Sequence, residues 1–135
     1  MLIVGVFLLL STDMSNKVSK QLTEKVWIQS NKDSFTYKNR RYLVENKHGY
    51  RFYEDGRLLI RQDLRWCGNG KSNWESIMGN WVQLSDSTVE LTYDLWGYRN
   101  TLIGEFKFIE SKNMYFNLQQ FEAPEQIKPT PFLQF

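Results

Sequence analysis

Residues 89–95 read VELTYDL, and this stretch alternates strictly between apolar and polar side chains. Val89, Leu91, Tyr93 and Leu95 share one parity, and the three residues between them are polar. Successive side chains of a β-strand point to opposite faces of the sheet. The pattern therefore predicts an antiparallel strand with one buried face and one solvated face.

The same period of two dominates the chain around this stretch. After Lys25, no run of apolar residues at helical spacing is long enough to predict an amphipathic helix. Three further runs place their apolar residues on one face: Leu102, Gly104, Phe106 and Phe108; Met114, Phe116 and Leu118; and Leu58, Ile60, Leu64 and Trp66. Gln62 occupies an inward position of the last run and is its polar exception.

Turn-forming residues separate the runs at short intervals, at Asn31–Asp33, Asn46–Gly49, Glu54–Gly56, Gly68–Asn73, Ser85–Ser87, Gly97–Asn100 and Ser111–Asn113. Asp55-Gly56 is the clearest signal, since Asp-Gly readily takes the positive φ of a two-residue hairpin. Seven turns imply about eight strands joined in order. The predicted fold class is all-β: a single antiparallel up-and-down meander of about eight strands that closes into a barrel, which removes unpaired edges.

The chain has 135 residues, enough for one domain. Its 16% aromatic content favours strands. We expect a hydrophobic signal-like segment at residues 1–14, a barrel domain at 25–121 and an extended tail at 122–135. The tail holds three prolines and cannot add a regular central strand. A short helix is expected over residues 15–24, ahead of the first strand.

The first ten residues, MLIVGVFLLL, are apolar but too few to span a bilayer, so no stable membrane span is expected. Their length suits the hydrophobic region of a signal peptide, although no Lys or Arg precedes them and no A-x-A site follows. A hydrophobic arm or first helix packed on the domain is the alternative. The protein is expected to be exported to the periplasm or the extracellular space if the segment is a signal, and cytoplasmic otherwise.

Three short motifs resemble the lipocalin-like (calycin) barrels, especially the small exported bacterial kind. Trp27 lies in the first strand, where those proteins place a Trp that plugs the barrel floor, with Lys25 where they have glycine. Residues 50–56, YRFYEDG, resemble their aromatic-x-Phe-x-x-Asp-Gly hairpin, and Gly79-Asn80-Trp81 is similar to an internal Gly-x-aromatic strand. The resemblance covers roughly residues 25–121. It implies a barrel interior that takes a small apolar molecule, with no catalysis and no cofactor.

An eight-stranded barrel is just wide enough either to be filled by side chains or to hold one small ligand, and the sequence leaves both open. For the hollow case, inward aromatic rings would supply apolar contact area, and Gln62 would orient a polar end. The candidate ligand-binding residues are Trp27, Gln62, Trp66, Trp81, Tyr93, Phe106, Phe108 and Phe116.

Charge divides unevenly along the chain, with a net of +6 over residues 1–71 and −4 over 72–135. Four arginines of the basic part are expected on one outer face and are candidate partner-binding residues: Arg51, Arg57, Arg61 and Arg65. With the Trp66–Trp74 loop, this face supports an alternative function, a protein-interaction module of the inhibitor or immunity type. No nucleic acid is expected, because the outward neighbours of these arginines, Leu59 and Asp63, are not aromatic.

Catalytic, metal and cofactor sites are not expected. Cys67 would need a base to act as a nucleophile, and His48 is the one histidine. Glu90 and Asp94 share a face, but it is the solvent face of their strand. Together with this lack of catalytic residues, the resemblance implies a non-catalytic, lipocalin-like binding protein with a small apolar or amphipathic ligand inside the barrel.

Overall fold

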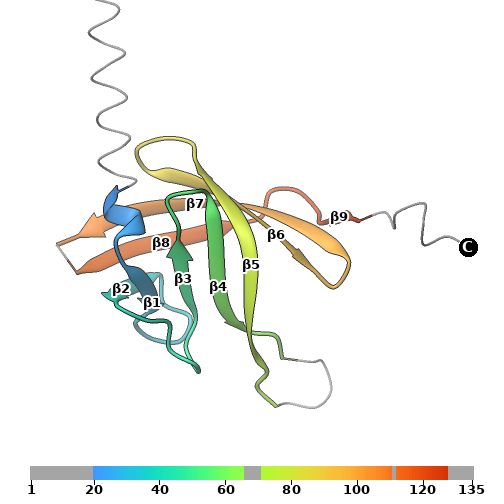
Figure 1. Ribbon diagram of the computed structural model, residues 1–135, viewed down its shortest axis with the longest axis horizontal. Coiled ribbons are helices and arrows are strands. Elements are labelled where there is room, and N and C mark those ends of the chain that lie inside the picture. Colours follow the sequence, from blue (N-terminus) through green and yellow to red (C-terminus); the bar gives the residue numbers. More distant parts are fainter. Residues whose placement is uncertain (1–19, 66–70, 111, 128–135) are drawn as a thin grey trace, which may run out of the picture.

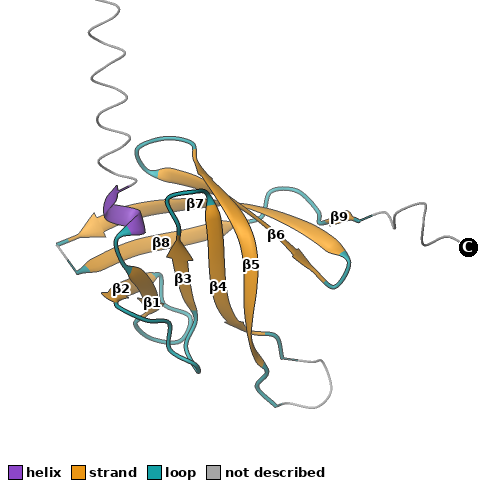
Figure 2. Cartoon of the chain, viewed as in Figure 1, coloured by secondary structure: helices purple, strands orange, loops and turns teal. Residues whose placement is uncertain are grey.

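The computed structural model describes residues 20–65, 71–110 and 112–127 (Figure 1). Within these residues, one helical turn at 20–23 precedes a chain built almost entirely of strands (Figure 2). The strands are β1 (Val26–Gln29), β2 (Thr36–Arg40), β3 (Gly49–Phe52), β4 (Arg57–Asp63), β5 (Trp74–Gln83), β6 (Thr88–Leu95), β7 (Tyr98–Ile109), β8 (Asn113–Gln119) and β9 (Glu125–Gln126).

Eight of these strands, β1 to β8, close into an antiparallel barrel. The sheet order is β6-β5-β4-β3-β1-β2-β8-β7, and the pairing of β6 with β7 closes the ring. The predicted fold class is thereby confirmed. The pairing is sequential from β3 to β8, whereas β1 lies between β2 and β3. The short β9 pairs only with Tyr98 and Arg99 at the start of β7, so the proline-containing tail adds an edge strand.

Residues 41–48 connect β2 to β3, and this connection explains why β1 is buried on both faces. Trp27 points into the barrel, yet its neighbours Val26 and Ile28, of opposite parity, are only 2% and 4% exposed. A side-chain carbon built on Gly49 would lie 2.8 Å from Cδ2 of Leu43 and 3.0 Å from Cδ1 of Ile28. The connection therefore covers the outer face of β1, whose apolar run replaces the alternation of the other strands.

The predicted inward positions on β4, β6, β7 and β8 are confirmed by burial. Their apolar residues are either fully buried in the core or partly buried and packed against it. The fully buried group includes Leu58, Ile60, Val89, Leu91, Phe106, Met114 and Phe116; the partly buried group includes Leu64, Tyr93, Leu95, Phe108 and Leu118.

Two hairpins differ from expectation. The β6–β7 turn consists of Trp96 and Gly97, with φ of 51° and 79°, and β7 already begins at Tyr98. The predicted turn over residues 97–100 was therefore placed too far along the chain. The β3–β4 turn is longer than two residues: the Gly56 N–H donates to the Tyr53 carbonyl at 3.0 Å, and Gly56 alone takes a positive φ there.

Several predictions fall on residues outside those described: the signal-like segment at 1–14, Trp66 and Cys67. No helix within the described ranges is long and apolar enough to cross a membrane.

Candidate functional site

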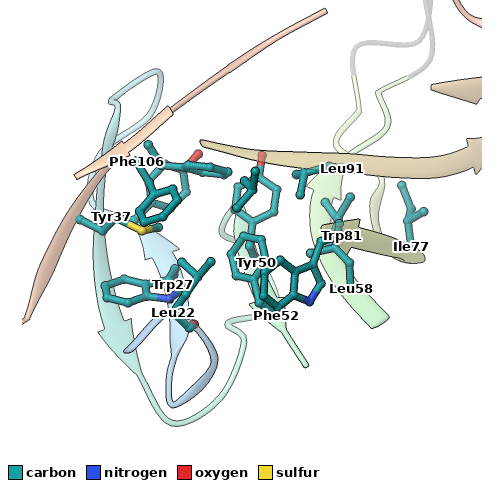
Figure 3. Close-up of a cluster of buried hydrophobic side chains, with 14 residues drawn as sticks. Leu22, Trp27, Tyr37, Tyr50, Phe52, Leu58, Ile77, Trp81, Leu91 and Phe106 are labelled. Carbon is teal, nitrogen blue, oxygen red and sulfur yellow. Dashed lines mark hydrogen bonds between the residues drawn. The ribbon is translucent and has the colours of Figure 1, made fainter. Parts of the chain in front are cut away.

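One half of the barrel is a packed core rich in aromatic rings, which we call the closed half; Figure 3 shows the buried cluster to which its side chains belong. The closed half lies where β1 begins and β3 ends. Trp27, 1% exposed, forms its floor, and the Trp27 Nε1–H donates to the Leu22 carbonyl at 3.0 Å. Trp81 donates from Nε1 to the Tyr53 carbonyl at 2.8 Å and meets the Phe52 ring edge-on at 5.4 Å. Both indole N–H groups thus have a backbone carbonyl as hydrogen-bond partner.

The other half is open, and its interior holds a chamber of about 480 Å³, the inner chamber. Every barrel strand except β5 contributes to its wall. The wall is apolar on the β7–β8 side and polar on the β1–β4 side, with Gln29, Asp33, Ser34, Phe35, Tyr37, His48, Tyr50, Ile60, Gln62, Tyr93, Leu102, Phe116 and Leu118 as its lining. Its size lies within the range of small-molecule sites.

A second, more polar chamber of about 560 Å³, the outer chamber, adjoins the first at the barrel mouth. Residues from the β1–β2, β2–β3 and β4–β5 connections line it, including Ser30, Lys32, Lys47, Arg65 and Ser72, together with Trp74 at the start of β5. Gln29, Asp33, His48 and Gln62 line both chambers and form the boundary between them.

Hydrogen bonds that each involve at least one backbone group hold the loops that surround the mouth. Gln29 accounts for two of them: its N–H donates to the His48 carbonyl at 2.8 Å, and its side-chain Nε2 donates to the Ser34 carbonyl at 2.9 Å. Across the mouth, the Asn73 N–H donates to the Asp63 carboxylate at 2.7 Å. The Gln29 N–H bond extends the pairing of β1 with β3 beyond the regular strands. The other two bonds tie the mouth loops to residues at the ends of β1 and β4.

Three aromatic side chains form the polar corner of the inner chamber. The His48 ring lies 5.0 Å from that of Tyr50 and 6.2 Å from that of Tyr37, and the two tyrosine hydroxyls share a hydrogen bond. Burial raises the pKa of Tyr37 to about 12 and also raises that of Tyr50. Both hydroxyls are therefore neutral across the physiological range.

Burial also lowers the pKa of His48 to about 4, so its imidazole is neutral at pH 7. Its Nε2 has no hydrogen-bond partner, although the atom is buried. Ser30 lines the outer chamber, and its Oγ is buried and unpartnered too. A buried polar atom without a partner costs about 1–3 kcal/mol, a cost that an ordered water or another hydrogen-bonding group removes.

The candidate ligand-binding residues divide between the two halves. Gln62, Tyr93 and Phe116 line the inner chamber. Trp27, Trp81, Phe106 and Phe108 belong to the packed core or lie against it, and Trp66 is outside the described residues. Trp74, at the end of the predicted binding loop, lines the outer chamber. The barrel is thus filled at one end and hollow at the other.

The polar corner was missed by the sequence analysis. His48 was placed in a turn, and neither Tyr37 nor Tyr50 was listed as a candidate. The parity of β3 carries the signal: His48 and Tyr50 share the inward parity of Phe52, which is 0% exposed. Extending the alternation two residues before the strand places the histidine inside the barrel.

Three of the four candidate partner-binding arginines lie on the outer side of β3 and β4, and Arg65 follows β4 and lines the outer chamber; each interacts with a neighbour. Arg57 pairs with Asp55 at 2.7 Å, and Arg65 pairs with Asp63 at 3.3 Å. Arg61 donates to the Glu45 carbonyl and to Ser76. Arg51 lies over the Tyr53 ring at 4.8 Å. Two of the four charges are therefore compensated locally.

Comparison of this chain with protein-family models, curated proteins and solved structures finds no match. No group of three or more metal-ligating side chains occurs among the residues that the structure describes.

Proposed function

We propose that this protein is a non-catalytic binding protein, lipocalin-like in architecture, that holds one small apolar or amphipathic molecule in the inner chamber. The observation that carries the proposal is the hollow half of the barrel, about 480 Å³ in volume and bounded by inward residues of seven strands. Transfer of an apolar ligand from water into such a site contributes roughly 25 cal/mol per Å² buried.

The chemistry of the chamber supports binding over catalysis. General acid–base catalysis works best with a group whose pKa lies near the working pH. Burial moves the pKa of His48 down to about 4 and that of Tyr37 up to about 12, away from neutrality in both cases. Such groups provide fixed, neutral hydrogen-bonding sites for a ligand.

The test is a titration with N-phenyl-1-naphthylamine, an uncharged apolar dye whose fluorescence rises when it leaves water. We expect saturable binding of one dye molecule per chain. Leu118→Trp, which puts an indole into the chamber, should weaken binding by about tenfold or more. Val82→Trp is the matched control, because Val82 is 58% exposed on the outer face of β5. Absence of saturable binding to the parent protein would refute the proposal.

A loss of stability in Leu118→Trp would also weaken dye binding. The thermal unfolding curve of each variant is therefore measured in parallel. Leu102→Phe is the second, milder substitution in the same wall. If both fold like the parent and both bind the dye as it does, the ligand does not occupy the inner chamber.

A further inference from the structure

The linings of the two chambers indicate which chemical class of ligand they select, if the inner chamber binds a ligand as the proposed function requires. The chambers differ in character. The inner one is bounded on its far side by Leu102, Phe116 and Leu118, whereas the outer one is lined almost wholly by polar and charged side chains. A molecule long enough to occupy both must place an apolar part inside and a polar part at the mouth.

The charges of the outer chamber indicate the sign of the polar part. Asp63 pairs with Arg65 and accepts the Asn73 N–H, so these two charges compensate each other. Lys32, Lys47 and Asp33 remain, which leaves the mouth with one positive charge in excess. A head group that carries one negative charge would balance the site.

Two buried, unpartnered atoms belong to residues of the chamber lining. His48, with its Nε2, lines both chambers, and Ser30, with its Oγ, lines the outer one. A neutral imidazole with its hydrogen on Nε2 donates one hydrogen bond, and a serine hydroxyl donates another. Hydrogen bonds from such donors to an ionised acceptor are stronger than those to a neutral one.

We propose that the ligand is an amphipathic organic anion, whose apolar chain occupies the inner chamber and whose carboxylate-like head meets His48, Ser30, Lys32 and Lys47 at the mouth. Asp33 is the one uncompensated carboxylate on this path and faces both chambers. It disfavours a head group of higher negative charge.

The experiment compares three molecules with the same twelve-carbon chain as competitors of the bound dye: dodecanoate, dodecanol and dodecyltrimethylammonium, each below its micelle-forming concentration. We expect dodecanoate to displace the dye at a concentration about tenfold lower than dodecanol does, and the cation to be weakest. Equal potency of dodecanoate and dodecanol, or a preference for the cation, would overturn the anion proposal. Dye binding would in either case still support an apolar site.

Substitutions then locate the head group. The double variant Lys32→Gln and Lys47→Gln should lose about tenfold in dodecanoate affinity and keep its affinity for dodecanol. The matched control replaces two exposed cations of β2 that line neither chamber, Lys38→Gln and Arg40→Gln. An equal loss in the control would show that overall charge, and not the mouth, attracts the anion, and this result would refute the site.

Ser30→Ala separates a binding role from a structural one. Because the Ser30 hydroxyl is buried and unpartnered, its removal should leave the unfolding midpoint unchanged or raise it. In the ligand complex the same hydroxyl donates to the head group, so the variant should bind dodecanoate several-fold more weakly. Unchanged dodecanoate affinity in a stable variant would remove Ser30 from the site.

Discussion

The two halves of the barrel are built from the same strands, yet the interior of one half is filled by side chains and the interior of the other holds a cavity. In the closed half, large rings pack against one another and the indole N–H groups of Trp27 and Trp81 each donate to a backbone carbonyl, so the space is filled. In the open half, the inward positions carry polar or smaller groups such as Gln62, Tyr93 and Leu102, and a chamber remains. Stability is concentrated where packing is complete, and binding capacity where it is not.

The largest effect should come from removing the floor of the closed half. Trp27→Ala deletes a ring that is 1% exposed and leaves the Leu22 carbonyl without its donor. We expect a loss of about 3–5 kcal/mol in the free energy of unfolding, measured by urea denaturation. Trp27→Phe should cost less, since it keeps most of the apolar volume. A loss below about 1 kcal/mol in the alanine variant would contradict the description of this half as the packed core.

The second prediction concerns the open half and pH. His48 has a pKa of about 4 in the folded protein and an ordinary value of 6.5. As the pH falls from about 6.5 to about 4, the unfolded chain binds a proton that the folded protein does not, so stability is lost over this window. The full effect is on the order of 3 kcal/mol.

Urea denaturation at pH 7.5 and pH 4.5 measures this loss, and His48→Gln isolates it from the contribution of the carboxylates. The variant should lose less stability between the two pH values than the parent protein. The same loss in both proteins would mean that His48 is accessible to protons in the folded state.

The boundary between the halves is the third place to test. A side-chain carbon on Gly104 would lie 2.5 Å and 2.8 Å from two atoms of the Phe116 ring, so the ring needs a residue without Cβ beneath it. Gly104→Ala should cost about 1–3 kcal/mol in unfolding free energy and shift the ring within the inner chamber. Adding Phe116→Leu, which shortens the side chain, should restore part of that loss. Additive costs in the double variant would argue against the contact.

The smallest effect distinguishes the halves most directly. Leu118→Phe adds volume beside the inner chamber, so we expect a change of less than about 1 kcal/mol in unfolding free energy. Leu58→Phe makes the same substitution at a position that is 0% exposed in the closed half, and it should cost about 1–3 kcal/mol. Equal costs at the two positions, measured by thermal and urea melts, would mean that the open half is packed as tightly as the closed one.

Much of the fold could be predicted from local pattern. The inward parity of β6, β7 and β8 is present in residues 89–118 as a plain alternation, and the closed barrel follows from strands that each bury one face. The position of β1 between β2 and β3 was not predictable in this way, because strand pairing depends on contacts between segments distant in sequence. The turn at Trp96 and Gly97 was misplaced because the positive φ of Trp96 has no strong local signal.

The candidate site was predicted only in part, for a related reason. Parity indicates which side chains point inward, and Gln62, Tyr93 and Phe116 were found by it. Parity does not indicate how far along the barrel axis a side chain lies. Trp27 and Trp81 share the inward direction of Tyr93 but fill the other half.

The sequence by itself determined that this protein is a closed antiparallel barrel with an aromatic interior, because the period of two is a local property that each strand carries alone. Only the tertiary structure decided where that interior is solid and where it is hollow, and that His48 lies beside the hollow with an unpartnered nitrogen. The physical reason is that a cavity depends on the summed volumes of side chains from many strands. Strand order and stagger determine which of those side chains meet.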